Sequence, residues 1–112
     1  MLKFIEVGDR SIPVDEDGYL CNLQDWDEAV ATEIARIEDI RLSTSHWEVL
    51  RLLRTFYNRH QLSPATRAFT NLVKRDLGAD KGKSIYLMRL FRGSPARTAS
   101  KIAGLPKPEN CI

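Results

Sequence analysis

Apolar residues recur along this chain with two different spacings, one typical of strands and the other of helices. Two short apolar runs, residues 2–7 and 11–14, flank the turn Gly8-Asp9-Arg10 and predict a pair of strands. A second turn, Asp15-Glu16-Asp17-Gly18, leads into Tyr19-Leu20-Cys21, which has the composition of a third short strand. The N-terminal part is therefore expected to form a hairpin or a three-stranded meander.

After the third short strand the apolar residues recur with the period of an amphipathic helix, and capping residues divide the sequence into about five helices. The expected starts are Asp25 as an N-cap, a capping box over Ser45-His46-Trp47-Glu48, Ser63-Pro64, Asp80 or Ser84, and Ser94-Pro95. The expected ends include His60, Leu77 and Gly104. The sequence thus predicts a mainly α domain with a small N-terminal β-hairpin, an α+β fold.

The chemically reactive side chains are few, and most have a structural explanation. His46 and His60 fall near the two ends of one predicted helix and lack a nearby cysteine, serine or carboxylate pattern, so a helix-end role is expected. Cys21 and Cys111 lie far apart without ligand spacing, which predicts neither a disulfide framework nor a zinc site. Cys21 is interpreted as a small apolar side chain of the core. No metal and no cofactor is expected.

The last residues place a cysteine where packing does not explain it. Cys111 is next to last, and it follows a Gly104 that is typical of a left-handed helix stop. Pro106 and Pro108 bias the backbone between them toward an extended arm. Because free cysteine is among the most buried residue types and chain ends are poorly ordered, reactivity explains Cys111 better than packing does. A frayed end with an incidental cysteine is the alternative interpretation.

The net charge of +2 conceals an uneven distribution of charge. Residues 1–40 carry eleven acidic side chains against three Lys or Arg, and residues 41–112 carry fourteen Lys or Arg against four acidic side chains. This asymmetry favours a basic face that contacts an acidic partner or a nucleic acid, and two predicted helices within residues 63–91 fit a weak helix-turn-helix pattern. A solvated helical surface explains such charge runs equally well. A nucleic-acid-binding or regulatory helical module is therefore the alternative function.

Length and hydropathy limit the class of protein. The 112 residues predict one domain with a modest core, too short for a large internal active-site cavity. No run approaches the roughly 20 apolar residues of a membrane span, and residues 1–6 lack the apolar segment of a signal peptide. A cytoplasmic protein without membrane contact is expected.

Several short motifs are spread over nearly the whole chain. They are Asp17-Gly18-Tyr19-Leu20, Ser45-His46-Trp47-Glu48-Val49, Arg54-Thr55-Phe56-Tyr57, Ser63-Pro64-Ala65, Lys81-Gly82-Lys83-Ser84, Tyr86-Leu87, Arg89-Leu90-Phe91, and Lys101-Ile102-Ala103-Gly104-Leu105-Pro106-Lys107-Pro108 followed by Cys111. Together they resemble the TusE/DsrC family of small sulfur-carrier proteins. The resemblance implies a single DsrC-like helical domain over residues 1–104, a mobile arm over residues 105–112, and a sulfurtransferase in which Cys111 carries sulfur as a persulfide.

The resemblance also implies a branch of the family and a set of partners. In the dissimilatory, DsrC-like branch a second tail cysteine lies eleven positions before the first, where this chain has Ser100. A hydroxyl cannot form a sulfur bridge, so a TusE-like role in thiolation of the tRNA wobble uridine is the better fit. That role implies a TusBCD-like donor complex and, as acceptor, a MnmA-like tRNA 2-thiouridylase with or without its tRNA. The expected partner-binding residues are Lys101, Gly104, Pro106, Lys107 and Pro108.

Overall fold

The N-terminal strands form a hairpin, as the spacing of apolar residues predicts. The computed structural model describes residues 3–109, in which β1 (Lys3–Val7) pairs antiparallel with β2 (Arg10–Val14). Gly8 closes the turn with a φ of +63°, a conformation that glycine adopts without strain. The expected third strand is reduced to a single bridge between Val14 and Leu20.

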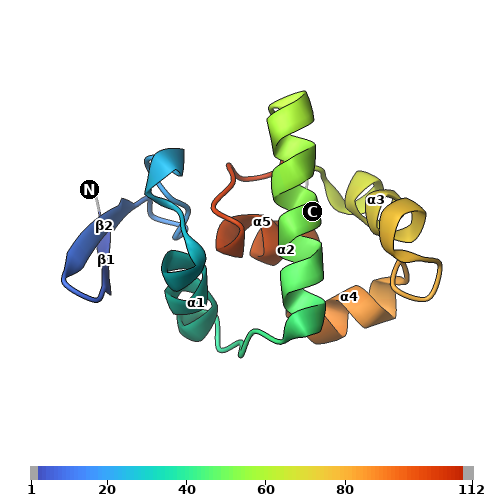
Figure 1. Cartoon of the computed structure of the whole chain (residues 1–112), viewed down its shortest axis with the longest axis horizontal. Helices are drawn as coiled ribbons and strands as arrows, with labels where there is room; N and C mark the ends of the chain where they lie inside the picture. The colour runs from blue at the N-terminus through green and yellow to red at the C-terminus, as the bar shows by residue number, and fades with distance from the viewer. Residues whose placement is uncertain (1–2, 110–112) are drawn as a thin grey trace.

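Within residues 3–109, five α-helices follow the hairpin, which confirms the mainly α fold expected from the sequence. After a short 3-10 turn, η1 (Leu23–Asp25), they are α1 (Glu28–Ile37), α2 (Thr44–His60), α3 (Thr66–Leu77), α4 (Ser84–Leu90) and α5 (Pro95–Ile102). Figure 1 shows the hairpin and α1 at one end of the molecule, α3 and α4 at the other, and α5 beside α2 between them. α5 contacts each of the other four helices. The helix that leads into the C-terminal arm is therefore the central element of the fold.

The core forms around α5 because that helix is lined with small side chains. Small residues let neighbouring helices approach closely, and large apolar side chains from α2, α3 and α4 fill the space that they leave. The buried residues of α5 and its end include Ala96, Ala99, Ile102 and Ala103, and those packed in the same core include Leu50, Leu53, Phe69, Leu87 and Phe91.

Two helices begin at residues other than those expected. Asp27, not Asp25, is the N-cap of α1, because its carboxylate accepts a hydrogen bond from the backbone N–H of Val30 at 2.9 Å. Asp25 instead ends η1. α3 starts at Thr66 rather than directly after Ser63, and its N-cap is Ala65.

The capping box of α2 also differs from the expected one. Its two members are Ser43 and His46, and the Nδ1 atom of His46 accepts the backbone N–H of Ser43 at 3.0 Å. The other ring nitrogen lies 2.8 Å from the carbonyl oxygen of Leu90, so it carries the proton and donates. Glu48, expected in the box, pairs with Lys81 at 2.7 Å. His46 therefore has the helix-end role that the sequence predicted.

Cys21 is exposed, and its interpretation as a core residue is wrong. It comes directly after Leu20, whose side chain is buried. Cys21 lies at a bend just past the isolated bridge between Val14 and Leu20, where the chain turns away from the hairpin.

Candidate functional site

The arm begins at a glycine that ends α5, as the sequence predicts. Gly104 has a φ of +74°, and its N–H donates to the carbonyl of Lys101 at 3.1 Å while the N–H of Leu105 donates to that of Ser100 at 2.9 Å. These two bonds form a Schellman motif. A Cβ atom at residue 104 would lie 2.3 Å from Cδ1 of Trp26, so this position excludes every side chain as well as requiring a left-handed backbone.

Two side chains from distant parts of the sequence hold the end of α5. The indole Nε1–H of Trp26 donates to the carbonyl of Ile102 at 2.8 Å, and Arg54 donates to that of Ala103 at 2.6 Å. The guanidinium of Arg54 lies 3.9 Å from the ring centroid of Trp26, a cation–π contact. Burial lowers the pKa of Arg54, but its guanidinium stays cationic. The positive charge is favourable at the C-terminal end of α5, because the helix dipole is negative there. We call Trp26, Arg54 and Gly104 the clasp.

Two residues of the clasp, Trp26 and Arg54, were missed by sequence reasoning as contacts of the arm's root. Trp26 lies 76 residues and Arg54 49 residues from the carbonyls that they bind. The only sequence signal was indirect, since Arg54 belongs to one of the family-like motifs and Trp26 was assigned to an apolar helix face. Neither signal places the two residues at the root of the arm.

The first residues of the arm lie on the body. Leu105 is buried at 2% exposure and Pro108 is buried as well, while the carbonyl of Pro106 accepts a hydrogen bond from the hydroxyl of Ser63. Lys107 pairs with Asp17 at 3.3 Å. The boundary expected after residue 104 therefore differs from the packing, which continues through residue 108; the mobility of the arm stays a prediction. Cys111 lies outside the described residues.

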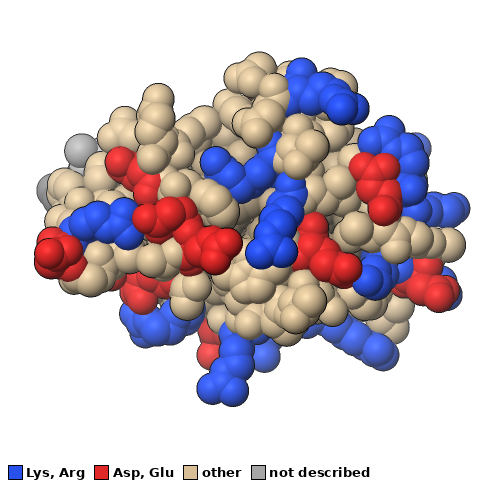
Figure 2. Space-filling model, in the orientation of Figure 1, with Lys and Arg blue, Asp and Glu red and all other residues tan. Residues whose placement is uncertain are grey.

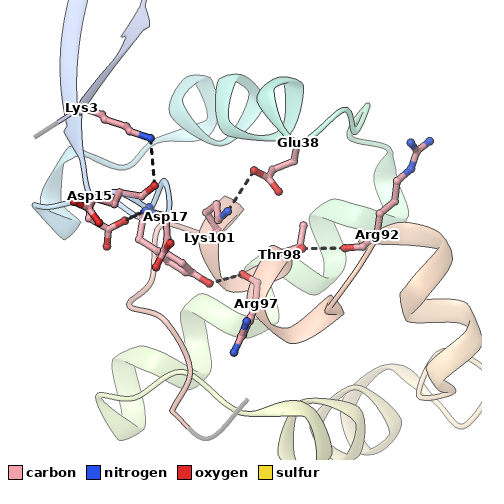
Figure 3. Close-up of polar contacts among 10 residues, drawn as sticks. Lys3, Asp15, Asp17, Glu38, Arg92, Arg97, Thr98 and Lys101 are labelled. Carbon is pink, nitrogen blue, oxygen red and sulfur yellow. Dashed lines mark hydrogen bonds and ion pairs between the residues drawn. The ribbon is translucent and has the colours of Figure 1, made fainter. Parts of the chain in front are cut away.

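Lys101, expected to bind a partner, also has a structural position. Its ammonium lies 3.3 Å from Glu38, the C-cap of α1, and 5.3 Å from the ring centroid of Tyr19, and its side chain is only 16% exposed (Figure 3). It therefore joins α5 to α1. Its role in partner binding stays a prediction.

Ser100 faces the interior in the last turn of α5. The residue is 1% exposed, and its hydroxyl has no hydrogen-bond partner among the described residues. Ser100 is thus buried. It occupies the position at which the dissimilatory branch of the resembled family has its second tail cysteine.

Charge is distributed over the surface as the sequence asymmetry implies. Figure 2 shows acidic side chains gathered toward the hairpin end and basic ones over much of the opposite end. Part of the basic set is compensated, since Arg75 pairs with Asp76 and Lys81 with Glu48. Within residues 3–109 no group of His, Cys, Asp and Glu has the arrangement of a metal site, and no helix is long and apolar enough to cross a membrane.

Comparison with known proteins shows which family the chain belongs to. The family model described as "DsrC like protein" matches residues 6–112. The chain belongs to the DsrC-like family. Among curated relatives, "Sulfurtransferase TusE" of Sodalis glossinidius is 48% identical over 108 residues, which is 96% of this chain and 100% of that protein. "Sulfurtransferase TusE homolog" of Haemophilus influenzae is 44% identical over 108 residues, 96% and 99% of the two chains.

Solved structures of the DsrC-like family share the fold. The NMR structure of Allochromatium vinosum DsrC superposes with a TM-score of 0.90 at 43% identity and full coverage of both chains. The crystal structure of the oxidized gamma-subunit of the dissimilatory sulfite reductase (DsrC) from Archaeoglobus fulgidus gives 0.83 at 33% identity, covering 98% of this chain and 100% of that one. The resemblance drawn from the motifs, and the fold expected with it, are confirmed.

Proposed function

We propose that this DsrC-like protein is a sulfurtransferase that carries sulfur as a persulfide on Cys111 in the relay for 2-thiolation of the tRNA wobble uridine. The observation that carries the proposal is the match of nearly the whole chain to relatives named sulfurtransferase TusE. The family match extends through residue 112 and so includes the cysteine.

The transfer is a displacement at sulfur. The thiolate of Cys111 attacks the outer sulfur of a donor persulfide; a new S–S bond forms, the donor's S–S bond breaks, and the donor cysteine leaves as a thiolate. In the second step a thiolate of the acceptor attacks the outer sulfur of Cys111–S–SH, the S–S bond of Cys111 breaks, and Cys111 leaves as a thiolate. Neither step needs an external oxidant or reductant. An unperturbed thiol has a pKa of about 8.5, so a small fraction is ionised at neutral pH and activation inside a partner's site is expected.

The root of the arm supports this role because it limits where the cysteine can go. The clasp and the hydrogen bond from Ser63 hold the backbone through Pro106, and Pro108 is buried. Three residues, from 109 to 111, then separate the body from the sulfur, a reach of about 10 Å at about 3.3 Å per residue. Such a short tether presents Cys111 to a partner from a fixed base.

The partners in this proposal are a TusBCD-like donor complex and a MnmA-like tRNA thiouridylase, and the compartment is the cytoplasm. Ser100 supports the TusE-like branch over a DsrC-like redox role, because its buried hydroxyl cannot form a disulfide with Cys111. A persulfide on Cys111 would then have a second protein as its partner in each step.

Intact mass measurement tests the proposal. After incubation with a cysteine desulfurase, cysteine and a TusBCD-type donor, the wild-type protein should gain one sulfur, about 32 Da, that a reductant removes. Cys111→Ser should gain none and should leave tRNA without 2-thiouridine, while its free energy of unfolding changes by no more than about 0.5 kcal/mol.

Cys21→Ser is the matched control, since Cys21 is an exposed thiol far from the arm in sequence. It should load and thiolate as the wild type does. Loading of Cys111→Ser, or normal thiolated tRNA in cells that carry only this variant, would contradict the proposal.

A further inference from the structure

The three-residue tether has a consequence for the body of the protein. A sulfur that reaches only about 10 Å beyond Pro108 cannot enter a partner's cleft unless the partner also covers the surface around the arm. We propose that two hollows on either side of the arm form a docking surface for the protein that exchanges sulfur with Cys111, with an apolar side chain over Leu62 and carboxylates toward Arg92 and Lys107. The inference rests on the proposed function of Cys111.

The first hollow supplies the apolar part of this surface. It has a volume of about 450 Å³ and lies between the start of α3 and the arm, where Leu62, Ala65 and Pro106 line it beside Glu109. Leu62 is 53% exposed. A single exposed leucine needs no explanation, but one that lines a hollow at the point where a reactive arm leaves the body is placed to contact whatever the arm enters.

The second hollow supplies charge on the other side of the arm. Its volume is about 340 Å³, and its lining includes Arg92, Arg97, Lys101 and Lys107 against Asp17 and Glu38. Lys107 lines both hollows, so the arm itself forms the ridge between them. Figure 3 shows the side chain of Arg92 pointing outward from the segment before α5, and it is 68% exposed. Lys101 pairs with Glu38, Lys107 with Asp17 and Arg92 with Asp39. The pairs of Arg92 and Lys107 are exposed and therefore weak, so a partner's carboxylates can compete for these two cations. The lining holds four cations against two carboxylates, which favours an acidic partner surface.

The mixture of groups favours a protein over a nucleic acid. Phosphates would meet the carboxylates of Asp17, Glu38 and Glu109 in the same surface, and in the Leu62 hollow the cation of Lys107 lies beside the carboxylate of Glu109. A protein surface can complement both the apolar hollow and the charged one, because protein interfaces combine an apolar centre with a polar rim. The end of this chain is a different possible occupant of the Leu62 hollow, and the experiment below distinguishes it from a partner.

Two variants and two matched controls test the docking surface in the full-length protein. Leu62→Ser removes the apolar contact and Arg92→Glu reverses the charge. Ile85→Ser and Lys83→Glu make the same changes at the start of α4, where Lys83 is the N-cap and Ile85 is 61% exposed. Neither residue lines either hollow. The readouts are the second-order rate of sulfur loading from a persulfidated TusBCD-type donor and the rate of loading from glutathione persulfide, a probe that needs no docking.

Leu62→Ser should slow loading from the donor about tenfold and Arg92→Glu about threefold at low salt, with both controls within about twofold of wild type. Loading from glutathione persulfide should be unchanged in all four. Equal donor rates for Leu62→Ser and Ile85→Ser would overturn the docking surface and leave the persulfide function standing. A wild type that neither source loads would overturn the function itself.

Two further outcomes would assign the surface to another occupant and so overturn the inference. Faster loading of Leu62→Ser by glutathione persulfide would mean that the hollow holds the end of this chain and shields Cys111. A loss of tRNA binding in the variants, with donor rates unchanged, would mean that the hollows serve a nucleic acid.

Discussion

A single glycine decides how the arm leaves the body. Gly104 combines a φ of +74° with a Cβ position 2.3 Å from Trp26, and no other residue type satisfies both conditions. The sequence predicted the left-handed stop, because glycine just after the last periodic residue of a helix is a known signal. It could not predict the contact with Trp26, since nothing in the spacing of the residues brings positions 26 and 104 together.

Gly104→Ala should destabilise the protein by about 2 to 4 kcal/mol, from a left-handed backbone and an overpacked contact with Trp26. Gly93→Ala is its matched control, because Gly93 has a φ of +72° and no atom within 4 Å of a built Cβ. That variant should lose only about 1 to 2 kcal/mol. Chemical denaturation of both proteins measures the difference, and equal losses would show that the contact with Trp26 relaxes without cost.

At the scale of single elements, capping explains both the successes and the errors of the sequence analysis. Ser94-Pro95 starts α5 as expected, because proline at the first helical position leaves few alternatives. In the segments before α1 and α2, several polar residues compete for the cap, and geometry selects Asp27 over Asp25 and the Ser43–His46 pair over Ser45–Glu48. Helix number and type were predictable from periodicity, whereas the choice among neighbouring caps depended on tertiary contacts such as those of His46 with Leu90 and of Glu48 with Lys81.

The cap of α1 should contribute to stability in a way that depends on pH. The hydrogen bond from Val30 and the bond and charge of Arg10 lower the pKa of Asp27. A carboxyl with a lower pKa in the folded state than in the unfolded state stabilises the fold at pH values above the unfolded pKa, about 3.9, and the contribution is lost as the pH falls through the folded pKa.

Asp27→Ala should therefore cost about 1 kcal/mol of unfolding free energy at pH 7 and less at pH 3. Asp27→Asn keeps an acceptor for the N–H of Val30 and should lose only a few tenths of a kcal/mol. Denaturant unfolding of the three proteins at both pH values is the measurement. A loss for Asp27→Ala that is the same at pH 7 and pH 3 would show that ionisation of the cap is irrelevant to its strength.

At the scale of the whole molecule, the ion pair of Asp17 and Lys107 joins the acidic N-terminal part of the chain to the C-terminal arm. Asp17 comes from the acidic N-terminal part and Lys107 from the arm, and their side chains lie 3.3 Å apart while both remain about half exposed. An exposed pair of this kind contributes little to stability, typically under about 1 kcal/mol. Its position suits steering of the arm, because the lysine belongs to the surface that the partner is proposed to cover.

Reversing these charges separates the two roles. Lys107→Glu should slow sulfur loading from a persulfidated donor about threefold at low salt, and the difference from wild type should fade as added salt shortens the Debye length from about 30 Å at 0.01 M to about 8 Å at 0.15 M. Asp17→Lys combined with Lys107→Glu restores an opposite pair at the same place and the original net charge. If the pair acts as a local tether, or if only the net charge at this place steers the partner, the double variant recovers the wild-type rate; if Lys107 itself contacts a carboxylate of the docked partner, the double variant stays slow. We expect the second result, because an exposed pair is a weak tether while Lys107 lines the surface that the partner is proposed to cover. Loading rates from the donor across ionic strength decide between them, and a Lys107→Glu protein with the wild-type salt dependence would show that this lysine has neither role.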